Sequence, residues 1–285
     1  MKDRLLPPGY PFSQSSLQDY VDCPRRFELR YVLRQAWPAV QAQPVTEHER
    51  HIWRGLAFHR LAHQHTLGIS TEELTAAVSD SDLGRWWQAY LAHPPDRLPS
   101  GLRLAEVALF THVQPHPTGD SYRLLAKYDL IAADSAQVVI VDWKTDQRRP
   151  SSEALARRLQ SRVYPFVIVE AGASLCRMAA LRAGQVTMTY WFADYPSQIE
   201  RIGYEETQHQ ANRRYLLELM AEIAGHGIGD FPLTQDERRC RFCVYRSLCD
   251  RGTAAGDLSE VDESSAASGW ADPDVDLEQV AETAY

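Results

Sequence analysis

The sequence contains no hydrophobic run of about 18 residues, which excludes a membrane-spanning helix. Its first residues, MKDRLLPPGYPF, lack the charged-then-apolar pattern of a secretory signal, so we expect a cytoplasmic protein. Glycine and proline stay at ordinary levels, 15 and 16 of 285 residues, which excludes collagen-like and low-complexity architectures. The composition, 44% hydrophobic and 24% charged, is that of a globular chain that can bury a sizeable core.

Positive charge is missing from the end of the chain. Residues 252–285 contain nine of the 38 acids, no Lys or Arg, and few large apolar side chains. This composition predicts a disordered tail, either a DNA-mimicking or partner-docking segment or a solubilising extension. Residues 1–251 hold all 30 basic side chains and the other 29 acidic ones, so we expect a nearly neutral domain there. Such a domain can still bind nucleic acid where its arginines cluster.

Cysteine is scarce and odd in number, with five in the chain, which argues against structural disulfides in a cytosolic protein. Three of them, Cys240, Cys243 and Cys249, lie within ten residues. A tetrahedral metal site or a cubane cluster needs four thiolates, and Cys23 is the candidate for the fourth. Cys176 lies in an apolar stretch that is typical of a buried free thiol. The cysteines alone leave both zinc and an iron–sulfur cluster open.

Hydrophobic periodicity predicts helices near the N-terminus and an alternation of strands and helices after residue 100. This order indicates an α/β fold, a central mixed β-sheet flanked by helices. Four successive β-branched residues at 138–141 predict a strand that is buried on both faces. The expected helices run from Ser13 or Ser15 to Cys23 and over 47–67, 71–92, 151–170 and 205–225, and the strands over 104–113, 122–132, 137–142 and 186–192.

Two aspartates, Asp129 and Asp142, lie on neighbouring predicted strands. A two-residue turn at 135–136 sets a register that places them opposite each other, with Cβ atoms about 4.5–5.5 Å apart. Lys144, two residues further along, faces the same side. Paired carboxylates repel each other unless a cation such as Mg²⁺ lies between them, and a nearby lysine can help a metal-bound water attack a phosphodiester. The alternative is an ordinary solvated hairpin end.

Further motifs accompany the hairpin in a fixed order. They are Cys23, Gly55-x-x-x-His59, Asp129, the D-x-K element Asp142-Trp143-Lys144, Gln160-x-x-x-Tyr164, and the cysteines Cys240, Cys243 and Cys249. With these motifs over residues 13–251, the chain resembles the PD-(D/E)XK nuclease superfamily. It is most similar to the iron–sulfur RecB-like branch, which includes the AddB nuclease domain and the CRISPR-adaptation nucleases.

The resemblance implies a restriction-endonuclease-like core in residues 1–251, whose N- and C-terminal helical parts are stapled by a 4Fe–4S cluster on the four cysteines. It also implies a catalytic Mg²⁺ or Mn²⁺ ion. The expected metal ligands are His59, Asp129, Asp142 and the carbonyl of Trp143.

The resemblance assigns catalytic roles to Asp129, Asp142 and Lys144, with Lys144 positioning the water. Gln160 and Tyr164, four residues apart, share one helix face and are expected to touch DNA or orient the lysine. Glu106, in the first predicted strand, is a further candidate for the metal shell.

The function expected from this resemblance is that of a metal-dependent DNA exonuclease that acts on single-stranded ends in repair or recombination. Its partners would be DNA and a helicase or another repair protein. Processing of CRISPR spacers is an alternative role for the same chemistry. A non-catalytic nucleic-acid-binding module of this fold and a zinc-dependent binding protein are the alternatives from other classes.

Overall fold

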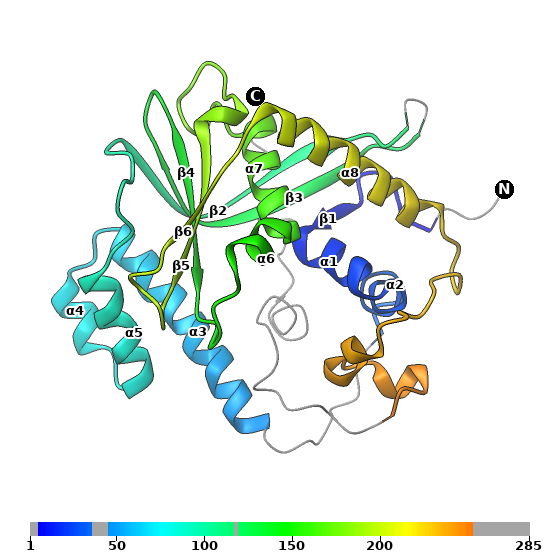
Figure 1. Ribbon diagram of the computed structural model, residues 1–285, viewed down its shortest axis with the longest axis horizontal. Coiled ribbons are helices and arrows are strands. Elements are labelled where there is room, and N and C mark those ends of the chain that lie inside the picture. The colour runs from blue at the N-terminus through cyan, green and yellow to red at the C-terminus, as the bar shows by residue number, and fades with distance from the viewer. Residues whose placement is uncertain (1–4, 36–44, 117–118, 253–285) are drawn as a thin grey trace.

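The computed structural model describes residues 5–35, 45–116 and 119–252, and a mixed six-stranded sheet forms its centre (Figure 1). The strands follow the order β1-β3-β4-β5-β6, and β2 pairs with β3 outside this path. Their bounds are β1 Pro11–Ser13, β2 Leu102–Val113, β3 Tyr122–Ala133, β4 Val138–Lys144, β5 Val186–Phe192 and β6 Glu200–Gly203. The α/β class and the mixed sheet flanked by helices are therefore confirmed.

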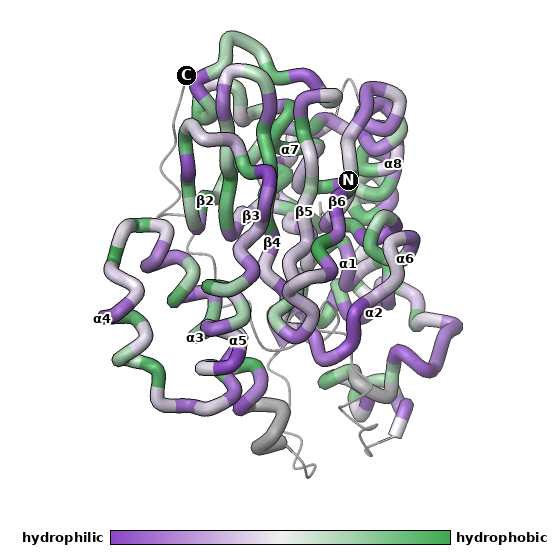
Figure 2. Tube along the Cα trace, turned by 60° about the vertical axis from the view of Figure 1, so that its left-hand side comes forward, coloured by the Kyte–Doolittle hydropathy of each residue, from purple (hydrophilic) through white to green (hydrophobic). Residues whose placement is uncertain are grey.

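Helices cover both faces of this sheet. We call the side covered by α1, α7 and α8 the α7 face, and the side covered by α3 and α5 the α3 face. The hydrophobic stretches in Figure 2 gather in the strands and in α7. The helices are α1 Gln14–Asp22, α2 Pro24–Phe27, α3 Val45–Thr66, α4 Thr71–Ala76, α5 Ser81–Ala92, α6 Ser152–Arg157, α7 Leu159–Ala171 and α8 Glu206–Gly225. Short helical turns cover Glu28–Val32, Ala183–Gln185, Glu237–Phe242 and Arg246–Cys249.

Strand β4 is buried on both faces, as its run of β-branched residues predicts. Val138 and Ile140 pack in the core of the α7 face, whereas Val139, Val141 and Trp143 pack in the core of the α3 face. Each buried aliphatic side chain of this kind contributes roughly 1.5–3 kcal/mol. The strand that carries the predicted D-x-K element is thus fixed from two sides.

Strand β3 has a different partner at each end of one edge. Residues 123–125 pair in parallel with β1, and residues 130–133 pair antiparallel with β4. Between these two pairings the same edge meets no strand among the described residues. The sheet therefore opens beside Asp129.

Several predicted elements differ in detail. The helix expected over 71–92 is two helices, because the Asp80 side chain accepts hydrogen bonds from the backbone of residues 82 and 83 and starts α5. The helix expected over 151–170 is broken at Arg158, whose backbone is extended. Strands β1 and β6 were not predicted because they are short and lack an alternating pattern.

Two further expectations concern the membrane and the tail. No helix in the described part of the chain is long and apolar enough to cross a membrane. The acidic tail expected over 252–285 lies outside the described residues, apart from Gly252.

Candidate functional site

The pairing of β2 with β3 places two carboxylates at one point of the sheet. The register on either side sets Glu106 opposite Asp129. Glu106 has a φ of 55°, in the left-handed region that non-glycine residues avoid. In a regular strand, side chains alternate between the two faces of the sheet. At Glu106 this alternation shifts by one residue, so Leu104 and Val107, three residues apart, both pack on the α7 face. Backbone strain of this kind is often retained at functional sites.

Helix α3 brings His59 to these carboxylates from the α3 face. The Nδ1 atom of His59 lies 3.2 Å from Oδ1 of Asp129, and the histidine side chain is 30% exposed. Gly55, one turn earlier, makes the approach possible, because a Cβ there would lie only 2.9 Å from Oγ1 of Thr145. The G-x-x-x-H pattern therefore has a steric basis, since glycine lets α3 sit against the end of β4.

His59, Glu106 and Asp129 each offer a ligand atom, and the three atoms lie within 4.8 Å of one another. One imidazole and two carboxylates suit a hard divalent ion such as Mg²⁺ or Mn²⁺, and three protein ligands leave positions for water and phosphate oxygens. The donor set therefore fits a divalent metal. Glu106 takes part in this group, whereas Asp142 lies beside it.

Asp142 turns its carboxylate toward the α7 face. Its Oδ1 accepts a hydrogen bond from Nε2 of Gln160, and its Oδ2 lies 2.9 Å from Nζ of Lys144. The register of β3 and β4 follows the predicted turn up to the pairing of residue 130 with 141, the last pair between these strands. The expectation that Asp129 and Asp142 face the same side is wrong, because Asp129 contacts His59 of α3 whereas Asp142 contacts Gln160 of α7. Beyond this point β4 leaves β3, and the N–H of Trp143 donates instead to Oδ2 of Asp129 at 2.9 Å. Asp129 is therefore the residue that joins the two groups.

The charges of the first group favour a proton on the histidine. Burial lowers the pKa of His59, but the Asp129 carboxylate outweighs it and raises this pKa to about 9. Burial also works to raise the pKa of Asp129, yet His59 and the Trp143 N–H hold it below its ordinary value. A metal ion that binds His59 therefore has to displace a proton at neutral pH.

The second group keeps its lysine charged. Burial alone lowers the pKa of Lys144, but the charges of Asp142 and Asp146 hold it above its ordinary value. The pKa of Asp142 is raised by burial and by Asp129, against the attraction of Lys144. Lys144 can thus donate hydrogen bonds and neutralise negative charge, but it is a poor proton acceptor.

Helix α7 supplies Gln160 and Tyr164 next to this lysine. Burial holds the pKa of Tyr164 well above its ordinary value, while a hydrogen bond with Gln160 opposes this shift. The hydroxyl of Tyr128 donates to the carbonyl of Tyr164 at 2.9 Å, which fixes the helix to β3. Both predicted residues therefore lie beside Asp142.

Two residues near Lys144 were missed from the sequence. Asp146 continues the two-residue spacing of Asp142 and Lys144, which was a usable signal. Tyr190 pairs with Asp142 across β4 and β5, and the centre of its ring lies 5.8 Å from Nζ of Lys144. Nothing in the local sequence indicates that pairing, because it depends on a crossover connection.

The four cysteines of the predicted cluster lie close enough to shift one another's pKa values, and no disulfide joins them. Burial, together with the nearby Cys243, Cys23 and Cys240, raises the pKa of Cys249 to about 11. Cys240 and Cys243 likewise show raised pKa values, caused first by burial and in part by Cys23. Cys176 lies apart from them, in the core of the α7 face.

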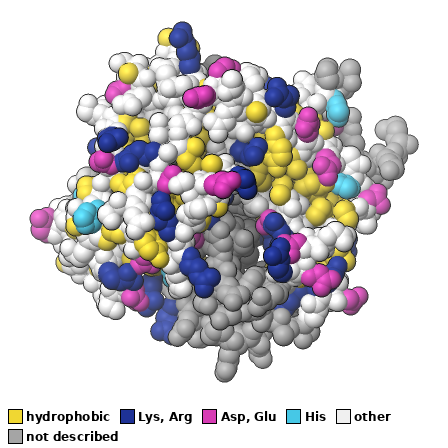
Figure 3. Space-filling model, viewed as in Figure 1, with side chains coloured by type: hydrophobic (Ala, Val, Ile, Leu, Met, Phe, Trp, Pro, Cys, Tyr) yellow, Lys and Arg dark blue, Asp and Glu magenta, His cyan; other side chains and the backbone are white. Residues whose placement is uncertain are grey.

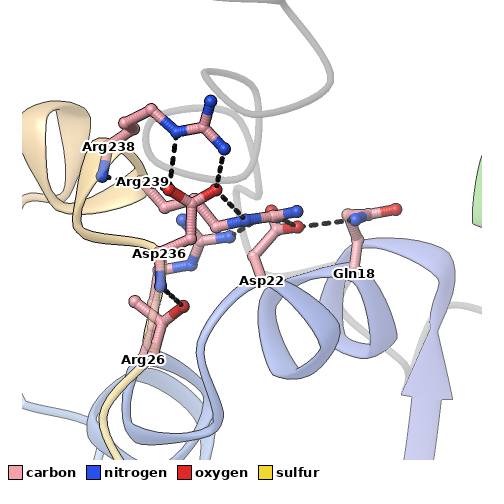
Figure 4. A network of polar contacts seen from close by, with 7 residues as sticks. Gln18, Asp22, Arg26, Asp236, Arg238 and Arg239 are labelled. Atoms are coloured by element: carbon pink, nitrogen blue, oxygen red, sulfur yellow. Dashed lines mark hydrogen bonds and ion pairs between the residues drawn. The ribbon is translucent and has the colours of Figure 1, made fainter.

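An ion-pair network joins α1 and α2 to the segment that carries the last three cysteines (Figure 4). Arg26 lies 2.8 Å from Asp19 and 2.7 Å from Asp22. Arg239 pairs with Asp22 and lies 3.6 Å from Asp236. The network holds Cys23, at the junction of α1 and α2, close to the C-terminal cysteines.

The model of one protein family matches residues 11–250, and that family is the PD-(D/E)XK nuclease superfamily. The chain belongs to the PD-(D/E)XK nuclease superfamily. Members of the superfamily are typically metal-dependent nucleases, and this membership implies a nucleic-acid substrate for the chain. No curated protein matches this PD-(D/E)XK chain.

Two solved structures are similar to this PD-(D/E)XK chain at low identity. A provisionally assigned exonuclease from Eubacterium rectale is 12% identical, with a TM-score of 0.46, over 79% of this chain and 84% of that one. The protein SSO0001 is 11% identical, with a TM-score of 0.38, over 86% of this chain and 87% of that one.

Proposed function

We propose that this PD-(D/E)XK protein is a Mg²⁺- or Mn²⁺-dependent DNA exonuclease of the RecB-like branch that acts on single-stranded ends. The observation that carries the proposal is the position of Asp129. It contacts His59 in one group and accepts the backbone N–H of Trp143, between Asp142 and Lys144, in the other. A water held between the two groups would meet both metal ligands and a fixed ammonium.

His59, Glu106 and Asp129 would hold the metal, and Asp142 would reach it from the second group. The bound ion would polarise the phosphate and lower the pKa of a water molecule. Lys144, which stays protonated, would orient this water and neutralise charge that develops on the phosphate oxygens. The water oxygen forms a bond to phosphorus while the bond from phosphorus to the 3′ oxygen breaks, which leaves a 5′-phosphate and a 3′-hydroxyl.

Gln160 supports this reaction from α7. Its amide nitrogen donates to Oδ1 of Asp142 and leaves Oδ2 to Lys144. The amide thereby fixes the rotation of the carboxylate, and Tyr164 one turn later shields this side of the site. Both residues act on the position of Asp142 and Lys144.

We also assign a 4Fe–4S cluster to Cys23, Cys240, Cys243 and Cys249. Three of these cysteines lie in one C-terminal segment and Cys23 lies at the junction of α1 and α2, so the four thiols bracket the nuclease motifs in the order of the iron–sulfur branch that the chain resembles. Four thiolates would also suit zinc. Iron and zinc analysis of anaerobically purified protein tests this assignment. About four irons per chain are expected, and one zinc per colourless chain would reject it.

The activity is tested with single- and double-stranded DNA labelled at the 5′ or 3′ end, in Mg²⁺, Mn²⁺ or EDTA. We expect metal-dependent loss of nucleotides from single-stranded ends. Binding without cleavage under all metals would instead support a non-catalytic module. Repair or recombination as the setting, a helicase partner and a cytoplasmic location stay predictions.

A further inference from the structure

An exposed tryptophan lies on the helix that carries His59. Trp53 is 70% exposed on α3, and Leu56 on the same helix is 49% exposed. The other described tryptophans on both sides of the site, Trp86, Trp87, Trp143 and Trp191, are buried. Trp53 and Leu56 together leave apolar surface exposed on the helix that carries His59, and contiguous apolar surface of this kind can mark a binding site.

The exposed residues form one stripe along α3. Trp53, Leu56 and Arg60 follow one another at steps of three and four residues, so they share a helix face. His59 is three residues after Leu56 and therefore borders this face. Trp53 precedes His59 by six residues, which corresponds to about 9 Å along the helix axis.

Charge on this side of the molecule favours a polyanion. Arg60 is exposed on the stripe itself. Figure 3 shows Lys and Arg side chains on the side of the hollow in its lower half where α3 runs, with Asp and Glu side chains between them. A flat aromatic ring beside basic side chains is the arrangement that binds single-stranded nucleic acid, in which bases stack and phosphates pair with cations.

We propose that Trp53 stacks on a base of the single-stranded DNA substrate, with Leu56 below the same nucleotide and Arg60 on a neighbouring phosphate. This inference rests on the proposed nuclease function. The axial offset of about 9 Å places the stacked base within a few nucleotides of the phosphate held at His59. A duplex has no free base to offer, so the stripe selects for single strands near the cut.

Binding in EDTA tests the inference without cleavage. The affinity of the full chain for a labelled single-stranded oligonucleotide is measured for wild type, Trp53→Ala, Trp53→Phe and Ile228→Ala. We expect Trp53→Ala to weaken binding roughly 5- to 150-fold and Trp53→Phe to restore most of it. Ile228→Ala removes a side chain that is also 70% exposed, after α8, and is expected to bind as wild type.

An abasic site moved along the oligonucleotide locates the contact. In wild type, an abasic site at one position within a few nucleotides of the cut should weaken binding, and in Trp53→Ala that position should have no effect. Arg60→Gln should lower the slope of log affinity against log salt by about 0.7, whereas Trp53→Ala should leave the slope unchanged.

The outcomes separate the two proposals. If Trp53→Ala binds every oligonucleotide as wild type does, the stacking inference is wrong, whether or not the wild type cleaves DNA. If the wild type cleaves nothing but Trp53→Ala still loses the base-specific affinity, stacking stands and the nuclease proposal fails. Equal losses for Trp53→Ala and Ile228→Ala would point to general loss of apolar surface and would also overturn the inference.

Discussion

The two halves of the candidate site differ in how firmly their charges are held. His59, Glu106 and Asp129 are partly exposed and come from three separate elements, α3, β2 and β3. Asp142 and Lys144 come from one strand, are 6% and 13% exposed at their side chains, and pair directly. The first half can release a proton and accept a metal, whereas the second half, which we call the fixed half, keeps the Asp142–Lys144 ion pair in place. The group that can exchange a proton for a metal ion and the group that can position a water molecule therefore lie on the two faces of one sheet.

The largest loss of activity is expected when the Asp142–Lys144 ion pair of the fixed half is removed. Lys144→Met should lower cleavage about 10²- to 10⁴-fold, because it removes the cation that orients the water and faces the developing charge. Single-turnover rates at saturating Mn²⁺ measure this loss. Arg97→Met is the control, since the Arg97 side chain is 81% exposed and lies 3.6 Å from Asp96, outside the site. Similar losses in both variants would contradict the special role of Lys144.

The position of His59 in the first half depends on the close contact of α3 with the end of β4. Gly55→Ala forces apart Cβ and Oγ1 of Thr145, so His59 should move by a few tenths of an ångström or more and cleavage should fall about 10²-fold. Gly225→Ala, at the end of α8 with open space around it, is the control and should keep full activity. Circular dichroism melting separates displacement from unfolding, because a folded but slow Gly55→Ala is the expected result.

Protonation of His59 sharpens the comparison, because only the first half should respond to pH near neutrality. The pKa of His59 without metal is about 9, above its ordinary 6.5. The bound proton therefore stabilises the metal-free fold below pH 6.5, and this contribution is lost as pH rises through 9. Metal affinity changes in the opposite sense and should rise about tenfold per pH unit below 9.

Calorimetric titration with Mn²⁺ between pH 6.5 and 9 measures this dependence. His59→Gln should bind Mn²⁺ more weakly and with a flat pH profile. A steep profile in that variant would show that another group releases the proton.

The smallest loss of cleavage is expected for Tyr164, at the outer edge of the fixed half. Tyr164→Phe keeps the ring that packs against Tyr128, with ring centres 5.1 Å apart, and loses only the hydroxyl next to Gln160. Cleavage should fall less than about tenfold, the loss of one neutral hydrogen bond. A loss as large as that of Lys144→Met would place the tyrosine hydroxyl in the reaction itself.

Local patterns in the sequence predicted the parts of the site that depend on neighbours in the chain. The two-residue turn after β3 determined the register of β3 with β4 as far as residues 130 and 141, and the N–H of Asp134 donates to the carbonyl of Gln137 across the turn. Gly55 and His59 were found because a helical turn separates them. Burial of β4 on two faces followed from its β-branched run.

The remaining parts depend on contacts between distant segments. Glu106 was held only as a candidate, because its left-handed backbone and its place opposite Asp129 exist only once β2 and β3 pair. The orientation of Asp142 toward Gln160 depends on how α7 packs against the sheet. Tyr190 requires the parallel pairing of β4 with β5, which no local pattern indicates.

The ion-pair network around Asp22 has a consequence for how the chain is made. Asp22 and Glu28 are buried, yet Arg239 and the N–H of Gly229, more than 200 positions later, are among their partners. While only the strands have left the ribosome, Asp22 and Glu28 lack these partners. Burying carboxylates without their partners is unfavourable, so the N-terminal segment should stay undocked from the sheet at that stage. Premature termination before residue 229 should therefore yield chains whose first helix is open to proteases, although every strand has already been synthesised.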